Sequence, residues 1–181
     1  MNAILINISL FQAGWFAAVF SAAASVPFLG ALAIAVAVAT HLARSERRDG
    51  EVRLLAVAGV VGFGWESLLV ATGLVQYGEA SAIPGTAPYW IVAMWLLFAT
   101  TLNVGMRWLR KSMIMTALVG AIGGPLSFFA GQKAGAVSFP DPMLSLTVIG
   151  LGWALFLPLL VLYAWRVEEQ SAIVTRALPD R

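Results

Sequence analysis

The sequence contains no cysteine, which excludes disulfides, thiolate nucleophiles, iron–sulfur clusters and zinc–thiolate sites. It has a single histidine, and only 11% of its residues are charged, against roughly 25% in soluble domains. Paired acids, histidine clusters, a glycine-rich phosphate loop and a Ser/His/Asp set are also missing, which excludes the familiar di-metal, nucleotide-driven and hydrolytic designs. We therefore expect no metal and no cofactor.

Apolar residues dominate instead, at 60% of the chain with a mean hydropathy of +0.87. They gather in runs of the length that a hydrocarbon core about 30 Å thick requires of a helix. The sequence therefore predicts an all-α polytopic membrane bundle of six transmembrane helices. We expect these helices over residues 4–22, 27–43, 54–75, 89–109, 113–131 and 144–165, with a transmembrane domain at 1–167 and a polar cytoplasmic tail at 168–181.

The basic residues predict the orientation. No Lys or Arg precedes Arg44, so the first apolar run lacks the charged start of a signal peptide and is expected to be a mature helix. Every Lys and Arg except Lys133 falls on one predicted side, which the positive-inside rule makes cytoplasmic. Both termini should then be cytoplasmic. A net charge of +2, distributed in this way, argues against nucleic acid as a partner.

Glu66 is the only acidic residue well inside an expected helix. A charge at bilayer depth costs at least about 2.5 kcal/mol, so such residues usually face a bundle interior or a cavity. Glu66 should lie about 18 Å from the cytoplasmic end, at 1.5 Å per residue, near or beyond the midplane. Three roles stay open for it: a general acid or base, a proton carrier, or a structural hydrogen-bonding group.

The fifth expected helix should pack closely and bend. Gly120 and Gly124 form a small-xxx-small pattern that allows two helix backbones to approach. Pro125 removes a backbone hydrogen bond and predicts a kink. The freed carbonyls either bind a ligand or are satisfied by a hydroxyl such as that of Ser127. Since this stretch should be as deep as Glu66, we predict a ligand pocket with five candidates: Trp65, Glu66, Ser67, Pro125 and Ser127.

A second polar group is predicted in the cytoplasmic half of the bundle. Its members are Gln12, His41, Thr100 and Asn103. Together they would suit a lipid headgroup. The alternative is ordinary interhelical contact, which averages only about 0.6 kcal/mol per pair in membranes.

The aromatic residues divide into belts and interior positions. Tyr77, Tyr89 and Trp90 fit an outer interfacial belt, while Trp108 and Trp165 fit an inner one. Four further tryptophans fall inside helices, where they either pack a core or line a pocket for an apolar ligand. They are Trp15, Trp65, Trp95 and Trp153.

Several segments together resemble a bacterial inner-membrane family. They are Phe11–Trp15, His41–Leu42, Leu96–Asn103, Gly124–Ser127 and Ala130–Gly131. The family is the domain-of-unknown-function family numbered twenty-eight seventy-eight, whose members carry an acid and a serine where Glu66 and Ser67 stand, with Asp more usual than Glu. The resemblance implies a multi-pass inner-membrane protein. Because the family's genes occur beside genes resembling cyclopropane-fatty-acid synthases and flavin amine oxidases, it also implies fatty-acid-modifying enzymes as partners.

Three functions are compatible with these observations. Interior tryptophans and a lone acid suit an amphipathic ligand, so the leading hypothesis is an accessory protein that holds membrane lipids for fatty-acid or phospholipid modification. The second is a small proton-coupled transporter that uses Glu66 and works as an oligomer. The third is a lipid-modifying membrane enzyme with Glu66 as acid or base and His41 as its partner, although their predicted depths argue against that pairing.

Overall fold

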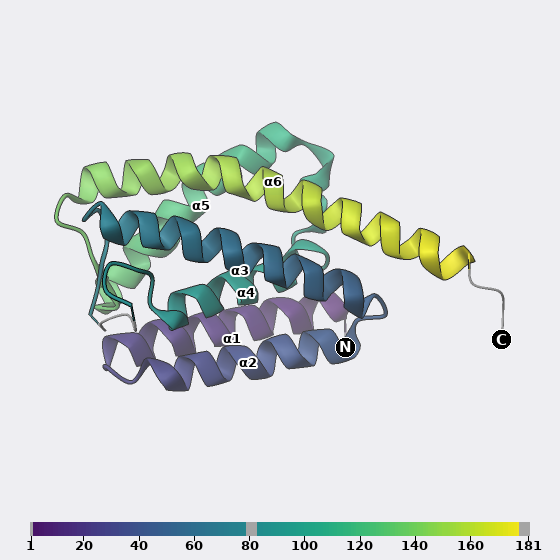
Figure 1. The fold of residues 1–181 in the computed structure, drawn as a ribbon, viewed down its shortest axis with the longest axis horizontal. Helices are drawn as coiled ribbons and strands as arrows, with labels where there is room; N and C mark the ends of the chain where they lie inside the picture. Colours follow the sequence, from purple (N-terminus) through teal and green to yellow (C-terminus); the bar gives the residue numbers. More distant parts are fainter. Residues whose placement is uncertain (1, 79–82, 178–181) are drawn as a thin grey trace.

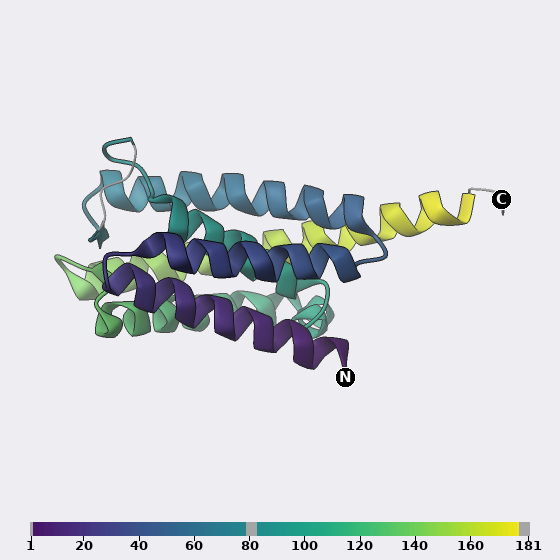
Figure 2. The same cartoon turned by 90° about the horizontal axis from the view of Figure 1, so that it is seen from below.

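A computed structural model describes residues 2–78 and 83–177, with side chains as far as residue 170. The described residues form six α-helices that run back and forth along the molecule (Figures 1 and 2). They are α1 (Ala3–Ala23), α2 (Pro27–Arg44), α3 (Arg48–Ala71), α4 (Tyr89–Leu102), α5 (Met113–Ala134) and α6 (Pro142–Ala177). The all-α fold is therefore confirmed. Five of these helices, all except α4, are long and apolar enough to cross a membrane.

Polar groups mark several of the helix starts. The Asn2 side chain accepts a hydrogen bond from the Ile4 amide at the start of α1, and the Ser112 hydroxyl accepts one from Met115 at the start of α5. Pro27 is the first residue of α2, where its missing N–H costs nothing. The α5 helix is capped by Gly135, whose φ of 88° is the left-handed conformation that glycine adopts easily.

The fourth helix is shorter than predicted. We expected 89–109, but α4 ends at Leu102 and a separate 3₁₀ helix, η1 (Arg107–Lys111), follows. At 1.5 Å per residue, α4 is about 21 Å long, which is less than a bilayer core. It lies against α1, α2, α3 and α6 and is the most enclosed helix, so it packs mainly on protein. The prediction of six full transmembrane spans is not confirmed.

Two other helices extend beyond the predicted limits. The third begins at Arg48 instead of residue 54 and ends at Ala71 instead of 75, so the basic stretch that we expected as a loop is partly helical. The sixth runs on past residue 165 to Ala177, where a polar tail was expected, and its end projects from the bundle in Figure 1. The division into domains at 167/168 stays a prediction.

The two ends of the bundle differ in charge. Figure 1 shows the N-terminus, the turns after α2 and α4 and the C-terminal part of α6 at one end, which carries Arg47, Arg107 and Lys111. We call this the basic end. At the opposite end, β1 (Gln76–Tyr77) pairs antiparallel with β2 (Val137–Ser138). This short ladder joins the connection after α3 to the connection after α5.

The large aromatic rings in the core pack directly against buried glycines. A Cβ on Gly62 would lie 2.2 Å from the Trp95 ring, and one on Gly124 would lie 2.4 Å from Trp153. Gly120 lies against the backbone carbonyl of Trp153, with 2.2 Å to the position of its missing Cβ. The close packing predicted from Gly120 and Gly124 is therefore confirmed, and its partner is α6.

Candidate functional site

A small cavity lies between the helices in the half of the bundle away from the basic end. Its volume is about 80 Å³. The walls come from α1, α3, α4, α5, α6 and β1, and they include Trp15, Tyr77, Trp90, Trp95, Phe98 and Trp153. We call it the aromatic cavity. The rings of Trp95 and Trp153 stack with centroids 4.8 Å apart, and Tyr77 meets Trp90 edge to face at 5.4 Å.

Glu66 is the one acid among the residues that line the aromatic cavity, and its side chain is completely buried. The Tyr77 hydroxyl donates to its Oε2 at 2.7 Å, and the Trp95 indole N–H donates to its Oε1 at 3.0 Å. Burial raises the pKa of Tyr77 well above its usual range, so this hydroxyl keeps its proton and is available to donate. Both partners are therefore neutral donors.

The carboxyl group of Glu66 has no basic neighbour among the described residues. None of the ion pairs that they form includes Glu66. An ionised carboxylate offers about four acceptor positions, of which the two donors occupy two. Buried charges are normally paired, so this arrangement leaves capacity for a further partner.

Glu66 also lies farther along its helix than predicted. It is 18 residues, or about 27 Å, from the start of α3 and five residues from its end. The prediction of about 18 Å was too small because it began the helix at residue 54. Glu66 therefore lies in the half of α3 that is nearer to the β1–β2 end.

A groove on the surface of the bundle adjoins the aromatic cavity. It lies mainly between α1 and α5, has a volume of about 400 Å³, and is lined by Gly123 and other apolar residues. Exposed Phe16 and Leu126 stand at its surface. The groove and the cavity share five wall residues: Phe11, Trp15, Phe98, Ser127 and Trp153. An apolar chain in this groove would therefore end beside the cavity.

The five predicted pocket residues divide into two groups. Glu66 and Ser127 line the aromatic cavity, and the Ser127 hydroxyl accepts a hydrogen bond from the Trp15 indole at 3.0 Å. Trp65, Ser67 and Pro125 are not among the residues that line it.

These three residues have packing contacts instead. Trp65 packs edge to face on Phe156, with centroids 5.0 Å apart. The Ser67 hydroxyl accepts from the Ala87 amide at 3.0 Å. Pro125 lies inside a continuous α5, and its ring lies against Gly150, which also covers the Ala121 carbonyl. The bend at Pro125 stays a prediction.

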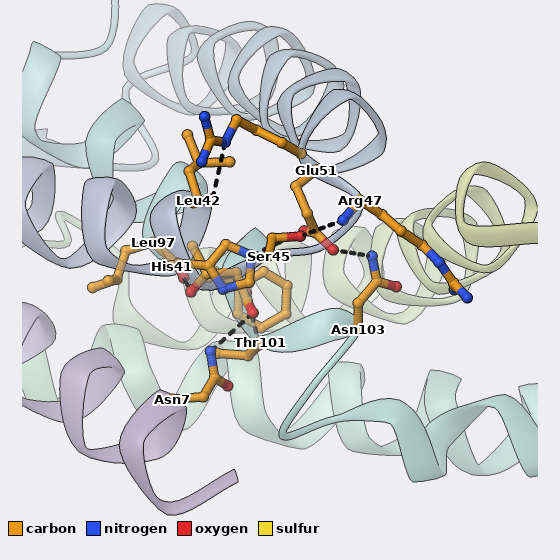
Figure 3. A network of polar contacts seen from close by, with 12 residues as sticks. Asn7, His41, Leu42, Ser45, Arg47, Glu51, Leu97, Thr101 and Asn103 are labelled. Carbon is orange, nitrogen blue, oxygen red and sulfur yellow. Dashed lines mark hydrogen bonds and ion pairs between the residues drawn. The ribbon is translucent and has the colours of Figure 1, made fainter. Parts of the chain in front are cut away.

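A polar network occupies the basic end. His41 Nε2 lies 3.0 Å from Oε2 of Glu51, and the Asn103 amide donates to the other oxygen of Glu51 at 2.8 Å (Figure 3). Arg110 joins Asn103 to Glu168, a residue of α6. Arg47 and Arg107 also donate to Glu168, at 2.9 and 2.8 Å. The network thus ties α2, α3, α4, η1 and α6 together, with its carboxylates matched by cations and amides.

The network contains two of the four polar residues predicted for this half. His41 and Asn103 meet through Glu51. The Thr100 hydroxyl donates within its own helix to Leu97, although its backbone carbonyl accepts from Asn7 at 3.0 Å. Gln12 is exposed and lines the α1–α5 groove. A polar cavity of about 400 Å³ adjoins the network, and two of the three arginines that line it, Arg47 and Arg107, contact Glu168.

Sequence reasoning missed three residues that shape these sites. Glu51 was assigned to a loop, although Asp49 and Glu51 together form the acidic first turn that is typical of a helix start. Tyr77 was interpreted as an interfacial anchor, but it donates to Glu66. Trp90 was also interpreted as an anchor, which is wrong because only 2% of it is exposed. Tyr89, Trp108 and Trp165 are exposed, as an interfacial belt requires.

The chemistry of the site sets limits on its use. No group of three metal-ligating side chains occurs within residues 2–78 and 83–170. His41 contacts Glu51, and its partner is not Glu66, so the acid–base pair considered from the sequence is not formed. What the aromatic cavity offers is a carboxyl group, aromatic rings and two buried indole N–H groups, of Trp90 and Trp153, that have no partner in the described part of the chain.

Comparison with known proteins gives one match. No curated protein and no solved structure matches the chain. A family model does match, over residues 4–159, and its description is "Protein of unknown function (DUF2878)". This span includes Glu66, the aromatic cavity and the α1–α5 groove. The chain therefore belongs to the DUF2878 family.

Proposed function

We propose that this protein holds an amphipathic membrane molecule, with its apolar chain in the α1–α5 groove and its polar end in the aromatic cavity. The observation that carries the proposal is the set of five residues shared by groove and cavity. An apolar groove beside a cavity that contains one carboxyl group suits a ligand with one chain and one polar end. A handling role for fatty-acid or phospholipid modification, with enzymes of that chemistry as partners, follows from the family resemblance.

The proposed location is the bacterial inner membrane, with both termini in the cytoplasm. Five apolar helices support a membrane location. The cluster of Arg and Lys at the basic end supports the orientation, because positive residues are retained on the cytoplasmic side. The groove would then lie at membrane depth, where a lipid enters sideways, and the aromatic cavity would lie toward the outer leaflet.

Gly123 provides the test of the groove. It lines the groove, and a Cβ added there would meet nothing within 4 Å, so Gly123→Leu should fill the groove without disturbing the bundle. Gly64 is the matched control, because it is also helical, exposed and free of neighbours within 4 Å, but it does not line the groove.

The measurement is native mass spectrometry of the purified protein, with extraction of retained lipids. We expect the wild type and Gly64→Leu to retain the same lipid or lipid-like molecule, and Gly123→Leu to lose most of it. Equal retention in all three proteins, or retention in none, would contradict the proposal. Proton-coupled transport through Glu66 would then become the better hypothesis.

A further inference from the structure

The aromatic cavity combines a buried acid with ring faces and has no basic residue in its walls. Its charged lining residue is Glu66, and the rest of the lining is aromatic or aliphatic apart from Ser127 and the Tyr77 hydroxyl. We infer that the polar end of the ligand is an organic cation, namely an ammonium group on an alkyl chain. This inference rests on the proposed function and names its ligand class.

Charge complementarity is the first argument. Glu66 is fully buried, and both of its contacts are neutral donors. A buried carboxylate requires an opposite charge, which the described side chains do not supply. An ammonium group in the cavity would supply it.

The ring faces are the second argument. Trp and Tyr faces attract cations through the quadrupole of the ring, and aromatic cages are the usual sites for quaternary ammonium ligands. Five such rings line the cavity: Trp15, Tyr77, Trp90, Trp95 and Trp153. An anionic end group would find the indole N–H groups of Trp90 and Trp153, but it would lie close to the Glu66 carboxylate in a medium that screens charge weakly.

The size of the cavity is the third argument. A water molecule takes about 30 Å³ of liquid volume, so a cavity of about 80 Å³ accommodates a few heavy atoms, the size of a small ammonium head, and not a whole lipid. The alkyl chain would then lie in the adjoining groove of about 400 Å³, which shares five wall residues with the cavity.

The test compares three probes with one chain length and different end groups. They are dodecyltrimethylammonium, the neutral carbon isostere with a tert-butyl end, and laurate. Binding to the full-length protein in a neutral detergent is followed by calorimetry and by tryptophan fluorescence. We expect wild type and Gly64→Leu to bind the cation at least tenfold more tightly than the isostere. Glu66→Gln should remove that preference, and Gly123→Leu should weaken all three probes.

The outcomes separate the two proposals. If wild type binds the cation and the isostere equally, or binds laurate most tightly, while Gly123→Leu still weakens binding, the cation inference is wrong and the groove proposal survives. If no probe binds to the wild type, both are overturned. The wild-type preference does not depend on the folding of any variant, so a Glu66→Gln protein that fails to fold leaves the test decisive.

Discussion

Glu51 and Glu66 lie on the same helix, and both are buried, with 7% and 0% of their surfaces exposed. Glu51 faces His41 and the Asn103 amide, within a network that continues to Arg110 and Glu168. Among the described residues, Glu66 accepts hydrogen bonds from a hydroxyl and an indole N–H. The two glutamates therefore differ in their roles. Glu51 connects helices through hydrogen bonds, and Glu66 has acceptor positions that a ligand could use.

The surroundings explain the difference. The basic end lies where the chain turns between helices. Arginines there pair with the carboxylates, and water screens the charges of the exposed arginines. Around Glu66, aromatic side chains pack against glycines, and none of the residues that line the aromatic cavity is basic. Stability should therefore depend on the basic-end network, and ligand binding should depend on the aromatic cavity.

The largest effect on stability is expected at Glu168. Glu168→Gln removes the charge that three arginines share, and only 14% of its side chain is exposed. Loss of one partner from a buried ion pair is costly, but Arg47 and Arg107 are partly in water, so we expect a loss of about 2 to 3 kcal/mol. Thermal unfolding in detergent measures it. Glu169→Gln, at an exposed neighbour, is the control, and equal losses in both variants would contradict the role of the network.

A somewhat smaller effect on stability is expected at Gly62, which packs against the Trp95 ring. Gly62→Ala places a Cβ within 2.2 Å of that ring and should displace the indole from Glu66. Overpacking of this kind costs about 1 to 3 kcal/mol. Gly64→Ala, in open space two residues away, should be neutral or slightly stabilising because alanine favours helix. If the two variants unfold at the same temperature, the packing of Gly62 against the Trp95 ring is not tight.

The smallest effect is expected for the Tyr77 hydroxyl. Tyr77→Phe removes the donor to Oε2 of Glu66 and keeps the ring against Trp90. A typical hydrogen bond contributes about 0.5 to 1.5 kcal/mol net, so we expect a loss of about 1 kcal/mol. Tyr89→Phe, at a residue that is 53% exposed, should change nothing measurable. A Tyr77→Phe protein as stable as Tyr89→Phe would mean that the hydroxyl is not needed at Glu66.

Those features that depend on composition and local pattern could be predicted from the sequence. Apolar runs predicted the helices, and the spacing of Gly120 and Gly124 predicted close packing, which Trp153 provides. A lone acid in an apolar run indicated Glu66. None of these predictions requires knowledge of which helices are neighbours.

The features that depend on helix neighbours could not be predicted. The donors to Glu66 come from β1 and α4, and no local pattern links Tyr77 or Trp95 to it. The shortness of α4 also follows from tertiary packing, because a helix enclosed by other helices need not match the bilayer. Glu51 was hidden among arginines, where only the helix-start signal distinguishes it from a loop residue.

The most direct test compares Glu66→Gln with Glu51→Gln in the same two assays, thermal unfolding and binding of dodecyltrimethylammonium. We predict that Glu66→Gln unfolds within about 1 kcal/mol of wild type, because Gln still accepts one of the two neutral hydrogen bonds, and that it loses the tight binding. Glu51→Gln should be clearly destabilised and still bind. If Glu66→Gln binds the cation as tightly as wild type, or if Glu51→Gln is the variant that loses binding, the claim that Glu66 binds the ligand and Glu51 stabilises the fold is contradicted.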